Sequence, residues 1–309
     1  MDATQLSIGI VMLLQICAGV LMNVFLLLFY IHMFSASPKF SSSDLILAHL
    51  ALANVMILLT FGISETLSAW GLRNFLDKYG CKIIFYLYRV ARGLAICTTC
   101  LLSVFQAVTI SPGNSPWAMI KAKLSKSIIP SCVLFWILNL LIDFDVLINM
   151  TSPQNSSNVQ IMLDFKYCSK VSISAETTLL ISIVFSLRDL FFVGLMSVAS
   201  GYMVFVLHRH HRLVQHLHRP GHSPGVMPEV TAAKRVIALV TLYVLLYGRQ
   251  TIMLSILVNL KEKSSLLVKS HMVLSFTFSA ISPFLVIHSD RRMKMFWKRE
   301  SPVSNLDPP

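Results

Sequence analysis

The sequence predicts an all-helical membrane protein, a single bundle of seven transmembrane helices with its N-terminus outside the cell and its C-terminus in the cytoplasm. Three observations predict this fold: seven long apolar segments, a low content of charged residues, and an uneven distribution of Lys and Arg among the connecting segments. The connecting segments are too short for a soluble domain, so residues 1–309 are interpreted as one domain.

Each apolar segment is about as long as a bilayer is thick. A helix that crosses the ~30 Å hydrocarbon core needs roughly 20 mostly apolar residues, and the backbone must satisfy its own hydrogen bonds in lipid, which favours helices. Hydrophobic residues make up 55% of the chain and charged residues 13%, which is low for a soluble domain. The predicted helices cover approximately residues 8–31, 45–69, 83–110, 128–148, 174–207, 236–258 and 267–288.

The net charge of +12 is concentrated on one side of the predicted bundle. Lys and Arg gather after the first, third, fifth and seventh segments, and such an excess marks the cytoplasmic side. This places the N-terminus outside. The basic surface is expected to face anionic membrane lipids and a cytoplasmic partner. Nucleic acid is not an expected partner, because the basic residues lie at membrane ends rather than on one soluble face.

The segment between the fourth and fifth predicted helices carries several features of an extracellular loop. Cys81 and Cys168 both fall outside, where disulfides persist, so we predict a Cys81–Cys168 bond that holds this loop over the mouth of the bundle. Two free thiols are the alternative. The loop also contains two N-x-[ST] acceptors, which makes Asn149 and Asn155 predicted glycosylation sites.

Ionisable residues inside the predicted helices are expected to face the bundle interior, because charge in lipid is unfavourable. Arg89 and Arg92 lie three residues apart on one helical face, with Tyr86 on the same stripe. They would line a cavity open to the outside, in which guanidinium groups bind the carboxylate or sulfate of a small ligand. The candidate ligand-binding residues are Glu65, Tyr86, Arg89, Arg92, Glu176 and Arg249.

The alternative is that these charges form interhelical ion pairs and hold the helices in register. Arg188 or Arg249 would then pair with one of the nearby aspartates, Asp143, Asp145 or Asp189. The arginines of the third helix need such a carboxylate, or the ligand itself, because an isolated buried cation is destabilising.

No motif predicts an enzyme, a cofactor or a metal site. The chain lacks G-x-x-x-x-G-K-[ST], H-E-x-x-H and G-x-S-x-G. The C-x-x-C of residues 97–100 lies in an apolar segment, where cysteines pack as small hydrophobes. Six histidines between residues 208 and 222 are typical of a solvated basic linker, with metal binding as the alternative. A small-solute transporter or channel is the alternative function, although neither internal repeats nor paired broken helices are evident.

Several sequence strings resemble those of vomeronasal type-1 receptors, a family of G-protein-coupled pheromone receptors. The third predicted helix reads RGLAICTTCLLSVFQAVTISP over residues 92–112, the second contains HLALAN at 49–54, and the fifth contains SLRDLFFVGLM at 186–196. Further matching strings are YGR at 247–249, SPF at 282–284 and SD at 289–290. The resemblance covers nearly the whole chain.

Comparison with the larger rhodopsin-like group shows both matches and departures. Asn23 and Trp136 match its first-helix asparagine and fourth-helix tryptophan, and Cys81 and Cys168 match its outer disulfide. Asn54 stands where that group has an aspartate, which puts a sodium site in doubt. The third helix ends in VTI at 108–110 rather than D-R-Y, and the proline of the last helix lacks the usual asparagine and tyrosine. These departures are similar to the vomeronasal type-1 pattern.

The resemblance implies a chemosensory receptor of the plasma membrane of vomeronasal sensory neurons. It would bind a small-molecule pheromone or odorant in an outward-facing helical cavity and activate a heterotrimeric G protein, of the Gi type. The arginines favour anionic ligands such as sulfated steroids or acids. An intact fold that no longer signals is a further alternative. The residues expected to contact the G protein are Gln106, Lys121, Lys123, Lys126, Lys234 and Arg235.

Overall fold

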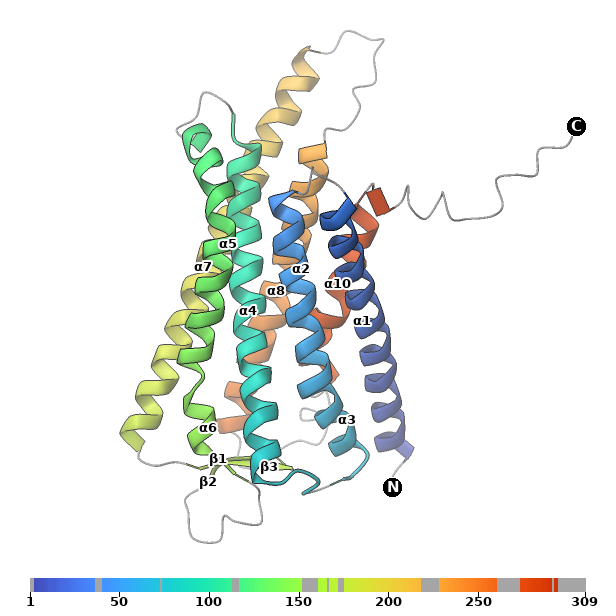
Figure 1. Ribbon diagram of the computed structural model, residues 1–309, viewed down its shortest axis with the longest axis vertical. Coiled ribbons are helices and arrows are strands. Elements are labelled where there is room, and N and C mark those ends of the chain that lie inside the picture. The colour runs from blue at the N-terminus through green and yellow to red at the C-terminus, as the bar shows by residue number, and fades with distance from the viewer. Residues whose placement is uncertain are drawn as a thin grey trace, which may run out of the picture.

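The computed structural model is a bundle of long helices that run side by side, with a small sheet at one end (Figure 1). It describes residues 3–36, 41–72, 74–112, 117–151, 161–165, 167–171, 175–217, 228–259, 273–290 and 292–293. The helices are α1 (Ala3–Ala36), α2 (Ser42–Ile57), η1 (Leu58–Gly62), α3 (Ile63–Ala69), α4 (Lys78–Ile110), α5 (Trp117–Ile142), α6 (Asp145–Asn149), α7 (Ala175–Leu217), α8 (Pro228–Asn259) and α10 (Thr277–Ser289).

The predicted helical character of the chain is confirmed, and helix is present in each of the seven predicted ranges. Residues 267–272 of the last range lie outside the described residues. Among the described residues, five helical stretches are long and apolar enough to cross a membrane: Gln5–Ser35, Ser42–Ala69, Lys78–Ile110, Lys123–Asn149 and Leu179–His210. The number of spans and the sides of the two termini stay predictions.

The second predicted span is one continuous helix with a π-helical turn inside it. The turn is η1, which joins α2 to α3 without a break in the helical backbone. A π-turn inserts extra backbone into a helix and changes the direction in which the following side chains point. Here it precedes Glu65, a predicted site residue that is buried in α3.

Helix α4 lies at the centre of the bundle and contacts α2, α5, α7 and α8. In the most apolar 18-residue segment of α4, 78% of the residues are buried. In the corresponding segments of the outer stretches Lys123–Asn149 and Leu179–His210, 22% are buried. A helix surrounded by other helices needs small or apolar residues on all sides. The run from Gly93 to Ser103, which contains the C-x-x-C cysteines, is buried throughout.

Close helix packing at Gly93 brings α5 against α4. A Cβ atom added at this glycine would overlap the Asn139 Oδ1 atom. Since no side chain fits in that space, Gly93 lets the Asn139 amide lie directly on the α4 backbone. This places Asn139, which sequence reasoning did not single out, among the charged residues of α4 and α7.

A three-stranded antiparallel sheet is the one part of the described fold that the all-helical prediction misses. Its strands are β1 (Met150–Thr151), β2 (Ile161–Phe165) and β3 (Cys168–Val171), in the order β1-β3-β2. Met150 pairs with Lys170, and Phe165 pairs with Cys168. Strands this short carry no clear alternation of apolar and polar residues, so the sequence pattern does not reveal them.

The sheet marks one end of the bundle, which we call the sheet end. Figure 1 shows the sheet at the bottom, where α1 and α4 begin, and the last turns of α10 at the opposite end. The described chain therefore starts at the sheet end and finishes at the opposite end, as an odd number of membrane crossings requires.

Candidate functional site

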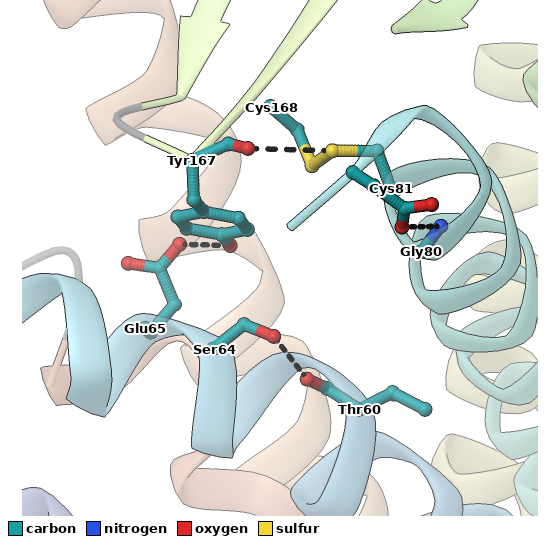
Figure 2. The surroundings of a disulfide bond; sticks show 8 residues. Thr60, Ser64, Glu65, Gly80, Cys81, Tyr167 and Cys168 are labelled. Atoms are coloured by element: carbon teal, nitrogen blue, oxygen red, sulfur yellow. Dashed lines mark hydrogen bonds between the residues drawn. A yellow bond between two sulfur atoms is a disulfide. The ribbon is translucent and has the colours of Figure 1, made fainter. Parts of the chain in front are cut away.

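The predicted disulfide is present and fixes the sheet to the bundle. Cys81 in the first turn of α4 is bonded to Cys168 at the start of β3, with a Cα–Cα distance of 5.8 Å (Figure 2). Both residues are completely buried. The predicted glycosylation sites are in the same loop: Asn149 ends α6 and is half-buried, and Asn155 lies outside the described residues.

The residue before Cys168 reaches down from the sheet into the bundle. Figure 2 shows the Tyr167 ring above α3, with its hydroxyl directed at Glu65. The hydroxyl donates a hydrogen bond of 2.8 Å to Glu65 Oε1, and the ring stacks on Phe75 and Phe85 with centroid distances of 5.3 and 5.9 Å. Burial, and then the negative charge of Glu65, raises the pKa of Tyr167, so the phenol remains a donor.

Glu65 is therefore engaged in holding the loop in place. Its side chain was predicted to bind ligand, and in the structure it accepts the hydrogen bond of Tyr167. The hydrogen bond and the disulfide hold two consecutive residues of the loop against different helices, α3 and α4.

We predict that Tyr167→Phe destabilises the protein while leaving the ring packing intact. The variant removes the donor to a carboxylate that is only 5% exposed, and an unmade buried hydrogen bond of this kind is worth about 1–3 kcal/mol. Thermal unfolding of the purified protein in detergent should show a lower midpoint. Tyr79→Phe, at a tyrosine that is 72% exposed, is the matched control and should leave the midpoint unchanged. Equal midpoints for the two variants would contradict this role of Tyr167.

Five charged side chains form an ion-pair cluster between α4, α5 and α7, which we call the arginine cluster: Arg89, Arg92, Asp143, Arg188 and Asp189. Asp143 follows the end of α5 and is completely buried. Its two carboxylate oxygens accept from Arg89 Nε at 2.9 Å and from Arg188 Nη1 at 3.3 Å. One carboxylate thus joins all three helices.

Asp189 is the second carboxylate of the arginine cluster. Arg188 donates to it from Nε at 3.0 Å, and Arg92 Nη2 lies 3.5 Å from its other oxygen. The Phe185 ring, one turn earlier on α7, lies 3.7 Å from the Arg89 guanidinium carbon and 5.3 Å from that of Arg188. Three cations thus share two anions, which leaves the cluster with a net charge of +1.

The ion-pair alternative of the sequence analysis named two of the four ion pairs in this cluster. Arg188 pairs with Asp143 and Asp189, two of the three aspartates named for it. Sequence reasoning did not find that Asp143 also holds Arg89, nor that the Asn139 amide oxygen accepts from Arg188 at 3.1 Å. Those partners are 54 and 49 residues apart in the chain, and no spacing rule connects them.

The predicted ligand-binding residues lie in different places. Arg92 lines a central cavity with Tyr88, Tyr243 and Phe278. Tyr86 instead donates a 2.9 Å hydrogen bond to the Leu140 carbonyl. The remaining members of the set are Arg89 in the arginine cluster, Glu65 against the loop, Glu176 exposed in the first turn of α7, and Arg249 on α8, whose side chain is outside the described part.

The central cavity is mainly apolar and aromatic, with a single guanidinium. It lies between α2, α4, α8 and the start of α10, and its wall also includes Ile57, Leu246 and Leu274. Among the predicted ligand residues with described side chains, Arg92 is the one on this wall. Its side chain is 33% exposed, so it is accessible from the cavity as well as from Asp189.

A polar network next to this cavity joins α1, α2 and α10. Asn23 donates to the Gly19 and Ser279 carbonyls at 2.7 and 2.9 Å. Asn54 donates to Asn23 Oδ1 at 3.2 Å and to Ser282 Oγ at 3.0 Å. These contacts are made by neutral groups, in keeping with the asparagine that replaces an aspartate at position 54.

At the end opposite the sheet, a second cavity of about 510 Å³ opens between the helix ends. Three predicted G-protein contacts line it, namely Gln106, Lys121 and Arg235. The other three, Lys123, Lys126 and Lys234, are exposed on α5 and α8. The cavity wall also carries charged residues that sequence reasoning missed: Asp44, Asp290 and Arg292.

In the described part of the chain, no group of three His, Cys, Asp or Glu residues is arranged to hold a metal ion. Cys97 and Cys100 are buried and not disulfide-bonded. Of the six histidines of the predicted linker, His208 and His210 are exposed on α7, whereas His218 and His222 lie outside the described residues.

Comparison with known proteins gives consistent matches. The model of the vomeronasal organ pheromone receptor family matches residues 6–299. The chain is 35% identical to human "Vomeronasal type-1 receptor 4" over 302 residues, which cover 97% of this chain and 100% of the relative. It is 37% identical to human "Vomeronasal type-1 receptor 3" over 295 residues, 95% and 94% of the two chains. It is also 34% identical to zebrafish (Danio rerio) "Olfactory receptor class A-like protein 1" over 295 residues, 95% and 92% of the two chains.

Proposed function

This chain belongs to the vomeronasal type-1 family of pheromone receptors, and from that premise we propose that it binds a small-molecule pheromone or odorant and activates a Gi-type heterotrimeric G protein. Membership makes it a multi-pass membrane protein and a signalling receptor rather than an enzyme. The family match over residues 6–299 is the observation that carries the proposal. The comparisons do not favour a transporter or channel. The proposed location is the plasma membrane of vomeronasal sensory neurons.

We place seven helices across this membrane, with the sheet end outside the cell. The disulfide at the sheet end supports this orientation, because such bonds persist in oxidising compartments. The excess of Lys and Arg in the connecting segments at the opposite end supports it independently. We propose that a ligand reaches the central cavity from the outside, and the cavity that carries Arg235 then lies at the cytoplasmic end.

The central cavity is the proposed ligand site, and Arg92 is the proposed anchor. Its aromatic and aliphatic wall suits an apolar body, and a guanidinium suits one anionic group on that body. Arg92 can turn from Asp189 to a ligand without leaving that carboxylate unpaired, because Arg188 also holds Asp189 at 3.0 Å. An apolar molecule with one acidic group, such as a sulfated steroid, has this chemistry. The cavity measures about 50 Å³, so a ligand of that size would bind only when side chains of the wall move apart.

A ligand activates the receptor by binding one conformation of the bundle better than the other. The favoured conformation would accept the G protein at the cytoplasmic cavity, lined by Gln106, Lys121 and Arg235. Exposed lysines of α5 and α8 are close in sequence to the wall residues Ser125 and Arg235, and they would attract acidic groups of the partner. They are Lys123, Lys126 and Lys234.

Calcium imaging tests the ligand site. Cells that express the chain with a promiscuous G-protein α subunit are challenged with panels of sulfated steroids, organic acids and the matching neutral alcohols. We expect responses to anionic members. Arg92→Gln should weaken the potency of these members by about tenfold or more, since a hydrogen bond to a charged group is worth ~1.5–3 kcal/mol.

Three comparisons make this result interpretable. Arg92→Lys should keep part of the potency, because it keeps the charge but loses the bidentate geometry. Arg209→Gln, the same substitution at an exposed arginine of α7, should respond as the wild type. Surface labelling of each variant distinguishes a loss of ligand binding from a loss of delivery to the cell surface. Full potency for anionic ligands in Arg92→Gln would move Arg92 to a purely structural role.

A further inference from the structure

At the end of the bundle opposite the sheet, consecutive residues of α5 and of α8 face in different directions. Ser125 of α5 and Arg235 of α8 line the second cavity, whereas their neighbours Lys126 and Lys234 are exposed and are not part of its wall. Consecutive residues of a helix lie about 100° apart around its axis, so one of each pair faces the bundle and the other faces away from it. The two lysines therefore lie at the level of the cavity but on the perimeter of the bundle.

On α5 the lysines begin a stripe of exposed apolar side chains. Lys123 and Lys126 are followed along the helix by Ile129, Val133 and Ile137, which are 66%, 52% and 50% exposed. Each step in this series is three or four residues, so all five side chains share one face of the helix. An exposed apolar face of this length on a multi-pass membrane protein lies against lipid tails.

Helix α8 shows the same pattern. Between residues 230 and 246, the exposed residues are Lys234, Ala238, Thr241 and Leu245, at spacings of four, three and four. These positions form a single stripe, and Leu245 in it is 66% exposed. Lys234 thus stands at the end of the lipid-facing side of α8, as Lys126 does on α5.

The cations at this end of the bundle fall into two groups. Those that face inward have protein partners: Lys121 donates to the Thr109 carbonyl at 3.4 Å, and Arg292 pairs with Asp44. The outward group differs, because none of the described hydrogen bonds or ion pairs holds its amines. Its members are Lys123, Lys126 and Lys234.

We propose that Lys123, Lys126 and Lys234 bind the headgroups of acidic phospholipids in the cytoplasmic leaflet. The proposal rests on the function proposed above, which places this end of the bundle in the cytoplasm. A lysine side chain lays its methylene groups along apolar surface and extends its amine to the headgroups. The phosphate and the net negative charge of the lipid then meet the amine, and the acyl chains lie along the apolar stripe of the same helix.

The position of these lysines favours a lipid over a protein segment bound in the cavity. Lys126 is separated from Ile129 by three residues, or about 4.5 Å along the helix axis, so its amine lies close to the hydrocarbon region. A water-soluble partner would have to enter the headgroup layer to contact it. The attraction of the partner that was proposed above acts over distance and needs no contact.

Native mass spectrometry of the full chain tests this proposal. The delipidated protein is mixed with equal amounts of phosphatidylserine and phosphatidylcholine that have the same acyl chains, and the two bound populations are compared. We expect the wild type to retain phosphatidylserine preferentially, by about fivefold for each lysine that contacts a headgroup. Combining Lys123→Gln, Lys126→Gln and Lys234→Gln should remove most of this preference.

Two further variants show whether the position and the charge of the lysines matter. Lys121→Gln, the same substitution on the same helix, should keep the wild-type preference, because Lys121 lines the cavity. Arginine at the three positions should also keep it, since the positive charge is retained. The two lipids compete in one sample, so an unfolded fraction of a variant lowers the binding of both and leaves their ratio unchanged.

Equal retention of the two lipids by the wild type would overturn the inference, and so would an unchanged preference in the combined glutamine variant. A loss in Lys121→Gln as large as in that variant would assign the preference to the cavity and overturn it as well. Neither a pheromone nor a G protein is present in this experiment, so a failure of the proposed function would be recognised separately.

Discussion

Asp143→Asn is expected to lower the free energy of unfolding by about 3–5 kcal/mol, the usual effect of removing one partner from a buried ion pair. Asparagine keeps the size of the side chain but removes the negative charge that faces both Arg89 and Arg188. The arginine cluster would then hold three cations and one carboxylate. Since Asp143 is completely buried, water cannot replace the missing charge.

Thermal unfolding of the purified protein and surface delivery in cells measure this effect. Glu176→Gln, the same kind of change at an exposed carboxylate of α7, should have little effect on either. Combining Asp143→Asn with Arg89→Gln should recover part of the loss, because the double variant no longer leaves Arg89 unpaired, and the recovery measures the coupling between the two residues. An unfolding midpoint for Asp143→Asn equal to that of the wild type would contradict this account of the cluster.

The double variant Cys81→Ser, Cys168→Ser is expected to lower the free energy of unfolding by about 4.6 kcal/mol in the chain-entropy account of disulfides. The bond closes a loop between cysteines 87 positions apart, and such long loops gain the most from a cross-link. Among the described contacts that would still hold the loop are the Tyr167–Glu65 hydrogen bond and the stacking of Tyr167 on Phe75 and Phe85, each of which is weaker than a disulfide.

Limited proteolysis and surface delivery measure the loss of the disulfide. The loop of the double variant should be cut faster and less protein should reach the surface. Cys17→Ser, at an exposed free cysteine, is the control and should behave as the wild type. If the double variant resists protease as well as the control does, the disulfide is not what fixes the loop.

The helices could be predicted because each depends on a continuous apolar segment of the sequence. The disulfide could be predicted because it depends on the compartment in which the cysteines lie. Long apolar segments specify helices in lipid whatever their neighbours are. Cys81 and Cys168 could be paired because they were the cysteines left in the oxidising compartment once the others were placed in apolar segments. The short sheet had no such signal, since its strands are two, five and four residues long.

The partners of the charged residues could not be predicted, because they depend on how each helix is rotated about its axis. Arg89 and Arg92 share a stripe three residues apart, yet Arg89 turns to α5 and Arg92 reaches the central cavity. A rotation of one helix by a fraction of a turn would exchange these environments. The same holds for Glu65, which follows a π-turn and meets Tyr167 from a loop 102 residues away.

The charged residues at the end opposite the sheet show a different limit of sequence reasoning. The sequence lacks the D-R-Y motif, so that motif could not point to charged partners at this end. The structure nevertheless places Asp44, Asp290, Arg292 and Arg235 around one cavity, drawn from α2, α8 and the residues at the end of α10. A motif search reads neighbours along the chain, whereas this group is assembled from residues up to 248 positions apart.

The central claim, that this chain is a small-molecule receptor that activates a G protein, is tested most directly by nucleotide exchange in a purified system. The receptor in nanodiscs is mixed with Gi heterotrimer and a fluorescent GTP analogue, and each compound that is active in the cell assay is added. The account predicts that these compounds accelerate exchange only when the receptor is present, and less so with Arg92→Gln. Unchanged exchange, together with ligand-evoked current or flux in a bilayer that contains the receptor without G protein, would contradict it.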